Sequence, residues 1–232
     1  ASCAFCLRKL IRVPDELFKV FQGIMAQNFY YDTSYYDDFY AIWDTYRTST
    51  PLITLVDPDR EVEMVNSLNP DLICITGDMM DGDHDRFKGF IEPIRRLKAK
   101  DGVYACTGNH EFYHCFDRWL PIYEEWGIKF LRDEAAFPHP ALALAGVDDE
   151  IGNRFRKDQT KVSPDVARAF ANAKDGQFRL LMEHRPGNAA DNMAKHGVDL
   201  QLSGHTHGGV LPVLSLLVGR WNNGFTKGVY EF

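Results

Sequence analysis

Short apolar runs alternate with segments of helical periodicity, and this alternation constrains the fold of the 232-residue chain more than any other feature. Seven of the runs have the length and the apolar content of buried strands. They are Phe39–Trp43, Asp71–Thr76, Val103–Thr107, Ile128–Leu131, Ala141–Gly146, Phe178–Met182 and Asp199–Leu202. Helical spacing of apolar residues occurs between several of them, in Arg86–Lys98, Phe116–Glu125 and Pro164–Ala173. This order predicts an α/β fold.

The composition is typical of a globular domain and argues against a nucleic-acid partner and against a membrane-spanning segment. Hydrophobic residues make up 45% of the chain, which is enough for a sizeable core at this length. The formal net charge is -7, so we expect no broad cationic surface and no nucleic-acid partner. The longest apolar runs, Ala141–Val147 and Val210–Gly219, are much shorter than the roughly 20 residues of a membrane-spanning helix. We therefore expect no transmembrane span.

The first 28 residues have a pattern of their own. From Pro14 onward, large apolar residues recur at helical spacing: Leu17, Phe18, Phe21, Ile24 and Met25. We interpret residues 1–28 as an N-terminal amphipathic helical extension and residues 29–232 as the main domain. Packing of this helix against the domain is the favoured alternative, and peripheral contact with a membrane or a partner is the other. We expect a cytoplasmic protein, or a membrane-associated one if residues 1–28 make that contact.

Polar residues follow four of the predicted strands at the point where each strand ends. They are Asp78, Asn109 with His110, His184, and His205 with His207. Ligands of open α/β sheets bind beyond the carboxyl ends of the strands, so these side chains are expected to converge although they lie far apart in the sequence. Carboxylate, amide and imidazole groups together favour Mn, Fe or Zn over calcium. The ordered set therefore predicts a metal site.

Each short motif also has a plainer explanation when it is taken alone. Asp78 after a glycine is typical of a turn, Asn109 of a surface loop, and a single buried His184 of a hydrogen-bonded core histidine. The pair His205 and His207, flanked by glycines, is harder to explain in this way. Glycines directly before Asp78, Asn109 and His205 would let the backbone approach a buried ion, because they carry no Cβ atom.

The ordered motifs Gly-Asp-x-x-Asp, Gly-Asn-His-Glu, a histidine after a strand, and Gly-His-Thr-His-Gly-Gly resemble those of the calcineurin-like metallophosphoesterases. The residues in and around these motifs are most similar to those of a bacterial branch whose members often carry a membrane anchor. The resemblance runs from about Asp44 to Gly209 and implies a four-layer αββα sandwich. Because 23 residues follow Gly209, we expect the last C-terminal strands of that sandwich to be missing.

The same resemblance implies an activity, namely hydrolysis of phosphoester bonds by a metal-activated hydroxide at a binuclear site. The implied cofactors are two divalent ions, Mn, Fe or Zn, and the implied substrate is a phosphorylated small molecule or lipid. Asp78 matches the carboxylate that bridges both metals, and His207 matches a ligand of one of them. The remaining ligands of the other metal match Asn109, His184 and His205.

Two further roles follow from the resemblance, and one ligand departs from the family pattern. His110 matches the histidine that protonates the leaving oxygen, and Asp81 is expected to orient that region from outside the ligand set. The family opens its site with Asp-x-His, which occurs nowhere in this sequence. Asp44-Thr45-Tyr46 follows the run Phe39–Trp43 and stands 34 residues before Asp78, whereas Asp57 stands only 21 residues before it.

We therefore prefer Asp44 to Asp57 as the first ligand. This alignment places the neutral phenol of Tyr46 where a histidine normally stands, and a phenol with a pKa near 10 is a poor ligand. The departure defines an alternative function, a catalytically weakened metal-binding domain with an incomplete first metal site. A third alternative is a structural domain in which the polar set is coincidental.

Overall fold

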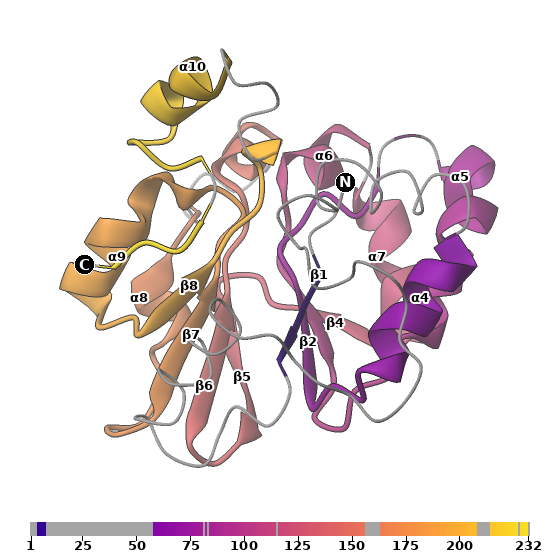
Figure 1. The fold of residues 1–232 in the computed structure, drawn as a ribbon, viewed down its shortest axis with the longest axis horizontal. Coiled ribbons are helices and arrows are strands. Elements are labelled where there is room, and N and C mark those ends of the chain that lie inside the picture. The colour runs from indigo at the N-terminus through magenta and orange to yellow at the C-terminus, as the bar shows by residue number, and fades with distance from the viewer. Residues whose placement is uncertain are drawn as a thin grey trace.

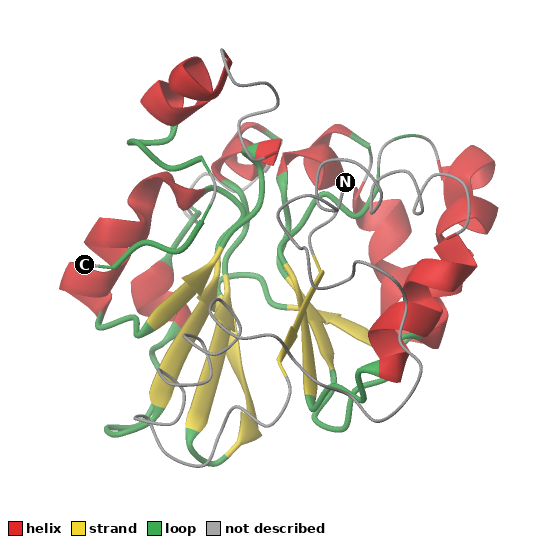
Figure 2. Cartoon of the chain, in the orientation of Figure 1, coloured by secondary structure: helices red, strands yellow, loops and turns green. Residues whose placement is uncertain are grey.

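The computed structural model describes residues 4–7, 58–80, 82, 84–114, 116–155, 163–207, 214–226 and 228–231. These residues form two four-stranded sheets that lie face to face (Figures 1 and 2). The first has the order β1 (Ala4–Leu7), β2 (Leu72–Ile75), β3 (Val103–Ala105), β4 (Ile128–Phe130). The second has the order β5 (Glu134–His139), β6 (Leu142–Gly146), β7 (Phe178–Met182), β8 (Leu200–Leu202).

Each sheet combines three parallel strands with one antiparallel strand. In the first sheet, β2, β3 and β4 are parallel and β1 pairs antiparallel with β2, with Phe5 opposite Cys74. In the second, β6, β7 and β8 are parallel and β5 pairs antiparallel with β6. The parallel strands of a sheet end at the same edge. The loops that follow β2 and β3, and those that follow β7 and β8, are therefore neighbours within their sheets.

Helices cover the outer faces of the two sheets (Figure 1). The α-helices are α4 (Pro58–Ser67), α5 (His84–Ile91), α6 (Asn109–Tyr113), α7 (Phe116–Glu125), α8 (Val166–Ala169), α9 (Ala189–His196) and α10 (Leu214–Trp221). Short 3₁₀ segments are η1 (Glu92–Arg96), η2 (Glu150–Arg154) and η3 (Pro186–Asn188). In Figure 1, α4, α5 and α7 lie beside the first sheet, and α8 and α9 lie beside the second.

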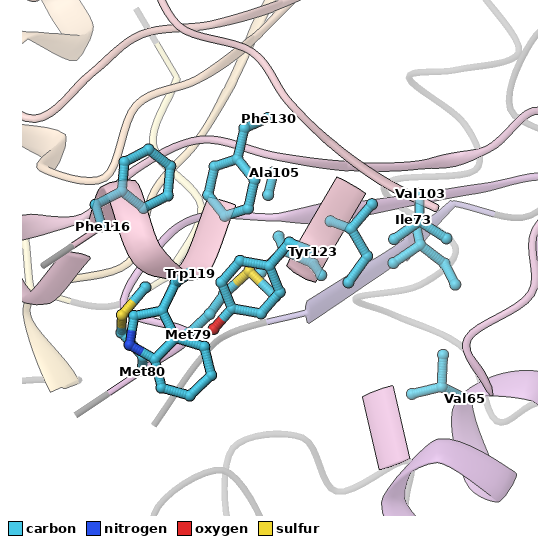
Figure 3. Close-up of a cluster of buried hydrophobic side chains, with 12 residues drawn as sticks. Val65, Ile73, Met79, Met80, Val103, Ala105, Phe116, Trp119, Tyr123 and Phe130 are labelled. Atoms are coloured by element: carbon cyan, nitrogen blue, oxygen red, sulfur yellow. The ribbon is translucent and has the colours of Figure 1, made fainter. Parts of the chain in front are cut away.

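Three hydrophobic clusters hold the layers together. Between the sheets, Cys74 and Cys106 pack with residues of the second sheet such as Leu144, and both thiols are buried. Outside the first sheet, a second cluster contains Trp119 and Tyr123 of α7 (Figure 3). A third cluster lies between the second sheet and α8 and α9. The result is a four-layer αββα arrangement, and the predicted α/β fold is confirmed.

The clusters also explain why the strands read as continuous apolar runs. Leu72 and Cys74 face the second sheet, whereas Ile73 and Ile75 pack in the cluster outside the first sheet. All four are buried, because β2 is covered on both faces. Six predicted strands contain an observed strand, and the predicted strand Phe39–Trp43 lies outside the described residues.

The sequence patterns missed several elements, and each omission has a physical reason. β5 is half exposed and contains Pro138, so it has no apolar run. α4 begins at Pro58 and its residues are mostly polar. The predicted helix Arg86–Lys98 is divided into α5 and η1, because Pro93 has no N–H to continue the α-helical hydrogen bonds.

The N-terminal segment is described only at residues 4–7, which form β1 and were not predicted as a strand. The amphipathic helix predicted from Pro14 lies outside the described residues. After β8, the described residues contain α10 and no strand. No helix in the described part of the chain has both the length and the apolar character that crossing a bilayer requires.

Gly146 offers a test of how closely the two sheets approach. A Cβ atom at Gly146 would lie 2.6 Å from Leu131 Cβ and 2.8 Å from the Leu131 carbonyl oxygen. Gly146→Ala should therefore push the sheets apart and lower the free energy of unfolding by about 1–3 kcal/mol. Gly89→Ala is the matched control, because nothing lies within 4 Å of the added atom in α5. It should raise stability by about 0.5–1 kcal/mol.

Urea denaturation measures both changes, provided that the slope of the transition stays constant. Equal stability of the wild type and Gly146→Ala would contradict the close approach of the sheets.

Candidate metal centre

The polar residues predicted to converge come from both sheets. Asp78 lies in the loop after β2, and Asn109 begins α6 directly after the loop that follows β3. His184 follows β7, and His205 follows β8. The carboxyl ends of four parallel strands thus deliver a carboxylate, an amide and two imidazoles to the seam between the sheets.

Three of these side chains lie close enough to share one ion. Asp78 Oδ2 is 3.1 Å from His184 Nε2, and His184 Nε2 is 3.2 Å from His205 Nδ1. The three ligand atoms all lie within 4.8 Å of one another. Neighbouring ligands of a transition metal, each about 2.0–2.2 Å from the ion, are separated by about 3 Å. The observed spacing therefore fits a single metal ion.

Asn109 contributes an independent observation in favour of a cation. The side chain is buried, and its Oδ1 atom has no hydrogen-bond partner among the described residues. A buried oxygen without a partner is costly, and such atoms are rare in native proteins. Its neighbour His110 donates its backbone N–H to Asp78 Oδ1 at 3.0 Å, which brings this turn of α6 against the ligand cluster. The Asn109 amide oxygen is therefore a candidate fourth donor.

A backbone carbonyl fixes the orientation of the His184 ring. His184 Nδ1–H donates to the carbonyl oxygen of Thr76 at 2.7 Å, because a carbonyl can only accept. Nε2 is thereby the atom that faces Asp78 and His205. A second hydrogen bond of this kind is the usual means of fixing a metal-binding histidine.

The electrostatics of the cluster differ from one ligand to the next. Burial alone would raise the pKa of the Asp78 carboxyl, but His184 and the backbone N–H of His110 hold this pKa well below its usual range. Burial, together with the charges of His184 and Arg185, lowers the pKa of His205 to about 4. Asp78 is therefore ionised and His205 is neutral near pH 7, and both are the forms that bind metals.

Close backbone contacts shape the loops that carry Asp78 and Asn109. A Cβ atom at Gly77, where φ is +90°, would clash with the backbone nitrogen of Gly108. A Cβ atom at Gly108 would clash with the Asp78 carboxylate. The sequence argument about these glycines therefore has a geometric basis at both positions. Met79 and Met80 are buried beside Trp119 and anchor the Asp78 loop in the core (Figure 3).

Backbone strain is concentrated at the site. Six described residues other than glycine have a positive φ, and three of them are Asp78 (+55°), His205 (+65°) and His207 (+47°). A residue with a side chain is disfavoured in this left-handed region, and such strain is frequent at functional sites. The surrounding contacts must therefore hold these side chains in place.

Glu111 helps to hold the loop that carries Asp78 in place. The sequence argument assigned it no role. Its side chain is fully buried and accepts three backbone N–H groups. Oε2 accepts from Asp78 at 2.9 Å and from Gly108 at 2.6 Å, and Oε1 accepts from Met79 at 2.6 Å. Glu111 thus joins the loop after β2 to the loop after β3. The only signal in the sequence was its place at the end of the Gly-Asn-His-Glu motif.

The structure does not bring every predicted site residue into the cluster. His207 is exposed and is not one of the three residues whose ligand atoms lie together. The ring of His110 lies beside Tyr113, with 5.9 Å between the ring centroids. Asp44, Tyr46, Asp57 and Asp81 lie outside the described residues. Their predicted roles stay predictions.

Glu111→Gln tests the junction between the loops. The amide can offer one oxygen where the carboxylate offers two, so at least one of the three N–H groups loses its acceptor. We expect the free energy of unfolding to fall by about 1–3 kcal/mol. We also expect metal affinity to fall about 10–100-fold, as for other residues that orient ligands. Glu124→Gln, on the exposed face of α7, should change stability by less than about 0.5 kcal/mol.

Calorimetry with manganese and urea denaturation measure the two effects of Glu111→Gln. Unchanged metal affinity would show that Glu111 does not position the ligands.

Comparison with known proteins shows which protein family the chain belongs to. The family model of the calcineurin-like phosphoesterases matches residues 34–209. An uncharacterized metallophosphoesterase of Helicobacter pylori is 32% identical over 173 residues, which cover 75% of this chain and 45% of the relative. A putative metallophosphoesterase of Caenorhabditis elegans is 34% identical and covers 73% of this chain and 36% of its own length.

A third relative, an uncharacterized metallophosphoesterase of Aquifex aeolicus, is 34% identical over 66% of this chain and 58% of its own length. The chain thus spans between about a third and three fifths of the length of these relatives. No solved structure matches it significantly.

Proposed function

Because the chain belongs to the calcineurin-like phosphoesterase family, we propose that it is a metal-dependent hydrolase that cleaves phosphoester bonds. The observation that carries the proposal is the cluster of Asp78, His184 and His205, supported by the partnerless Oδ1 atom of Asn109, whose neighbour His110 bonds Asp78. This donor set suits a divalent transition metal. The spacing of the cluster supports the same assignment.

Two divalent ions, Mn, Fe or Zn, are the proposed cofactors. Asp78, Asn109, His184 and His205 would hold one ion. His207, Asp44 and a shared Asp78 would hold the other, and Asp81 would orient the region. When bound, the ions would act as Lewis acids toward the phosphoryl group and the attacking water.

His110 is the proposed general acid, which gives a proton to the leaving oxygen. It lies in the first turn of α6, where its backbone N–H fixes Asp78 and its side chain stays half-buried. In-line displacement requires a proton donor on the side of the leaving group, away from the water nucleophile, and the proposal assigns that role to His110. The His110 ring lies edge-on to the Tyr113 ring.

The wider context of the protein is also proposed from the sequence and the relatives. The substrate is a phosphorylated small molecule or lipid. Residues 1–28 are proposed as an extension whose helix, from Pro14 onward, packs against the domain or makes peripheral membrane contact, although residues 4–7 within it form β1. Residues 29–232 are proposed as the metallophosphoesterase domain. Relatives from Danio rerio and Bos taurus are named transmembrane proteins with a metallophosphoesterase domain. We propose a cytoplasmic location for this chain, with association at the membrane surface if residues 1–28 make that contact.

Metal content and turnover together test the proposed function against its alternative. The purified chain is loaded with manganese, its ions are counted by mass spectrometry, and hydrolysis of 4-nitrophenyl phosphate is measured. The hydrolase should hold two ions and turn over the ester. One ion with little turnover would instead support the weakened metal-binding domain, in which Tyr46 leaves the first metal site incomplete. No ion and no turnover would refute both.

Substitution of His110 tests its assignment as general acid. His110→Ala should lower turnover of an alkyl phosphate about 10²–10⁴-fold with metal content preserved, because an alkoxide leaves poorly without a proton. Turnover of 4-nitrophenyl phosphate should fall much less, since nitrophenolate leaves unaided. His139→Ala, in β5, is the control and should change neither rate. Equal losses for the two esters would remove the general-acid role.

Asp44 and Asp57 compete for the position of the first ligand. Asp44→Ala should deplete one of the two ions, whereas Asp57→Ala should leave both in place. Ion counts of the two variants decide between them. The reverse ranking would assign the ligand to Asp57.

A further inference from the structure

Two exposed aromatic side chains meet beside the proposed general acid. Tyr113, at the end of α6, is 50% exposed, and Phe155, directly after η2, is 55% exposed. Their ring centroids are 6.2 Å apart, and the planes meet at 73°. Single exposed apolar residues are ordinary on protein surfaces. A pair of exposed rings from two separate segments at the edge of a site is less common. Rings that stay exposed contribute little hydrophobic stabilisation to the fold.

The pair is continuous with the candidate metal centre. Asp78 accepts the backbone N–H of His110, and the His110 ring lies 5.9 Å from the Tyr113 ring, which in turn contacts Phe155. A leaving group that takes its proton from His110 must lie beside the His110 ring. Tyr113 and His114 flank that ring, with 5.9 and 6.0 Å between ring centroids, and Phe155 lies against Tyr113.

Neighbouring contacts hold this surface in a fixed shape. A Cβ atom at Gly152 of η2 would lie 2.6 Å from the Phe112 ring, so η2 packs directly against α6. The Asp149 side chain accepts the backbone N–H of Ile151 at 2.9 Å. The backbone N–H of Asp149 donates to Thr107 Oγ1 at 3.0 Å. A preformed surface binds more tightly, because less freedom is lost on binding.

The charge next to this surface is balanced. Arg185 donates to both carboxylate oxygens of Asp149, at 2.7 and 3.2 Å, and lies 3.6 Å from Glu150 Oε1. Its positive charge is therefore already matched by two carboxylates, and it offers little extra attraction to an anionic leaving group. Stacking and edge-on contacts of the aromatic rings remain as the main source of recognition.

We propose that Tyr113 and Phe155 form a leaving-group subsite that favours phosphoesters whose leaving group carries a planar ring. The proposal rests on the proposed function and adds a substrate class to it. Stacking on an aromatic side chain changes affinity by roughly 5–30-fold for each ring. The subsite acts on the leaving group and leaves the binding of the phosphoryl group unchanged.

Binding of two phosphonates to the manganese-loaded protein tests this subsite without any turnover. Benzylphosphonate and butylphosphonate carry the same charged group, and only the first carries a ring. Calorimetry should give tighter binding of benzylphosphonate to the wild type. Tyr113→Ala and Phe155→Ala should each weaken it roughly 5–30-fold while changing butylphosphonate affinity less than about twofold.

Two control variants separate the subsite from general surface effects. Tyr113→Phe keeps the ring and should keep the preference for benzylphosphonate. Phe137→Ala removes a ring that is 44% exposed in β5 and should leave both affinities unchanged. Thermal unfolding of each variant checks that the fold persists.

The outcomes distinguish failure of the subsite from failure of the proposed function. Equal affinity for the two phosphonates, or tighter binding of butylphosphonate, would overturn the subsite while hydrolysis of 4-nitrophenyl phosphate still supported a hydrolase. Tighter binding of butylphosphonate would point to an alkyl leaving group of the lipid type. Binding of neither phosphonate, together with absent hydrolysis, would refute the hydrolase and the subsite with it.

Discussion

The contact between Asp78 and His184 is the interaction on which the organisation of the site depends. It joins the loop after β2 to the loop after β7, and so it joins the two sheets at the edge where their parallel strands end. His184 also bonds Thr76 through its other nitrogen, which ties the second sheet back to the first at a second point. The core between the sheets is apolar and not directional, so polar contacts at the carboxyl edges align the sheets. The contacts of His184 act there together with those of Thr107 and Arg132, which bond Asp148 after β6.

That alignment is maintained against local strain. Asp78 and His205 adopt backbone angles that side chains disfavour, and Gly77 and Gly108 approach so closely that neither position has room for a Cβ atom. Two favourable contributions to folding offset this strain. They are the burial of Met79 and Met80 in the core and the three N–H groups accepted by Glu111. The rigid part of the site is therefore the core side of each loop, and the ligand atoms project from it.

The sequence predicted the convergence of Asp78, His184 and His205 because each follows a strand, and strand ends meet by topology alone. It could not predict contacts that depend on which loops touch. Glu111 bonds residues 32 and 33 positions away, and Tyr113 meets Phe155 from a separate element. β5 was not predicted for a different reason. Its residues are exposed or partly exposed, so the sequence lacks the apolar run that is typical of a buried strand. Patterns of burial can be read from a sequence, whereas the partners of a buried polar group cannot.

The cluster also explains why the proposed metal would favour the folded chain. The Asn109 oxygen is buried with no partner among the described residues, which is a cost to the folded state alone, because the unfolded chain exposes the same oxygen to water. The Asp78 carboxylate carries no such cost, because His184 and the backbone N–H of His110 lower its pKa and so favour its charged form in the folded chain. A divalent ion that bound the proposed ligands of the folded chain alone would give Asn109 a partner and would stabilise the fold by mass action.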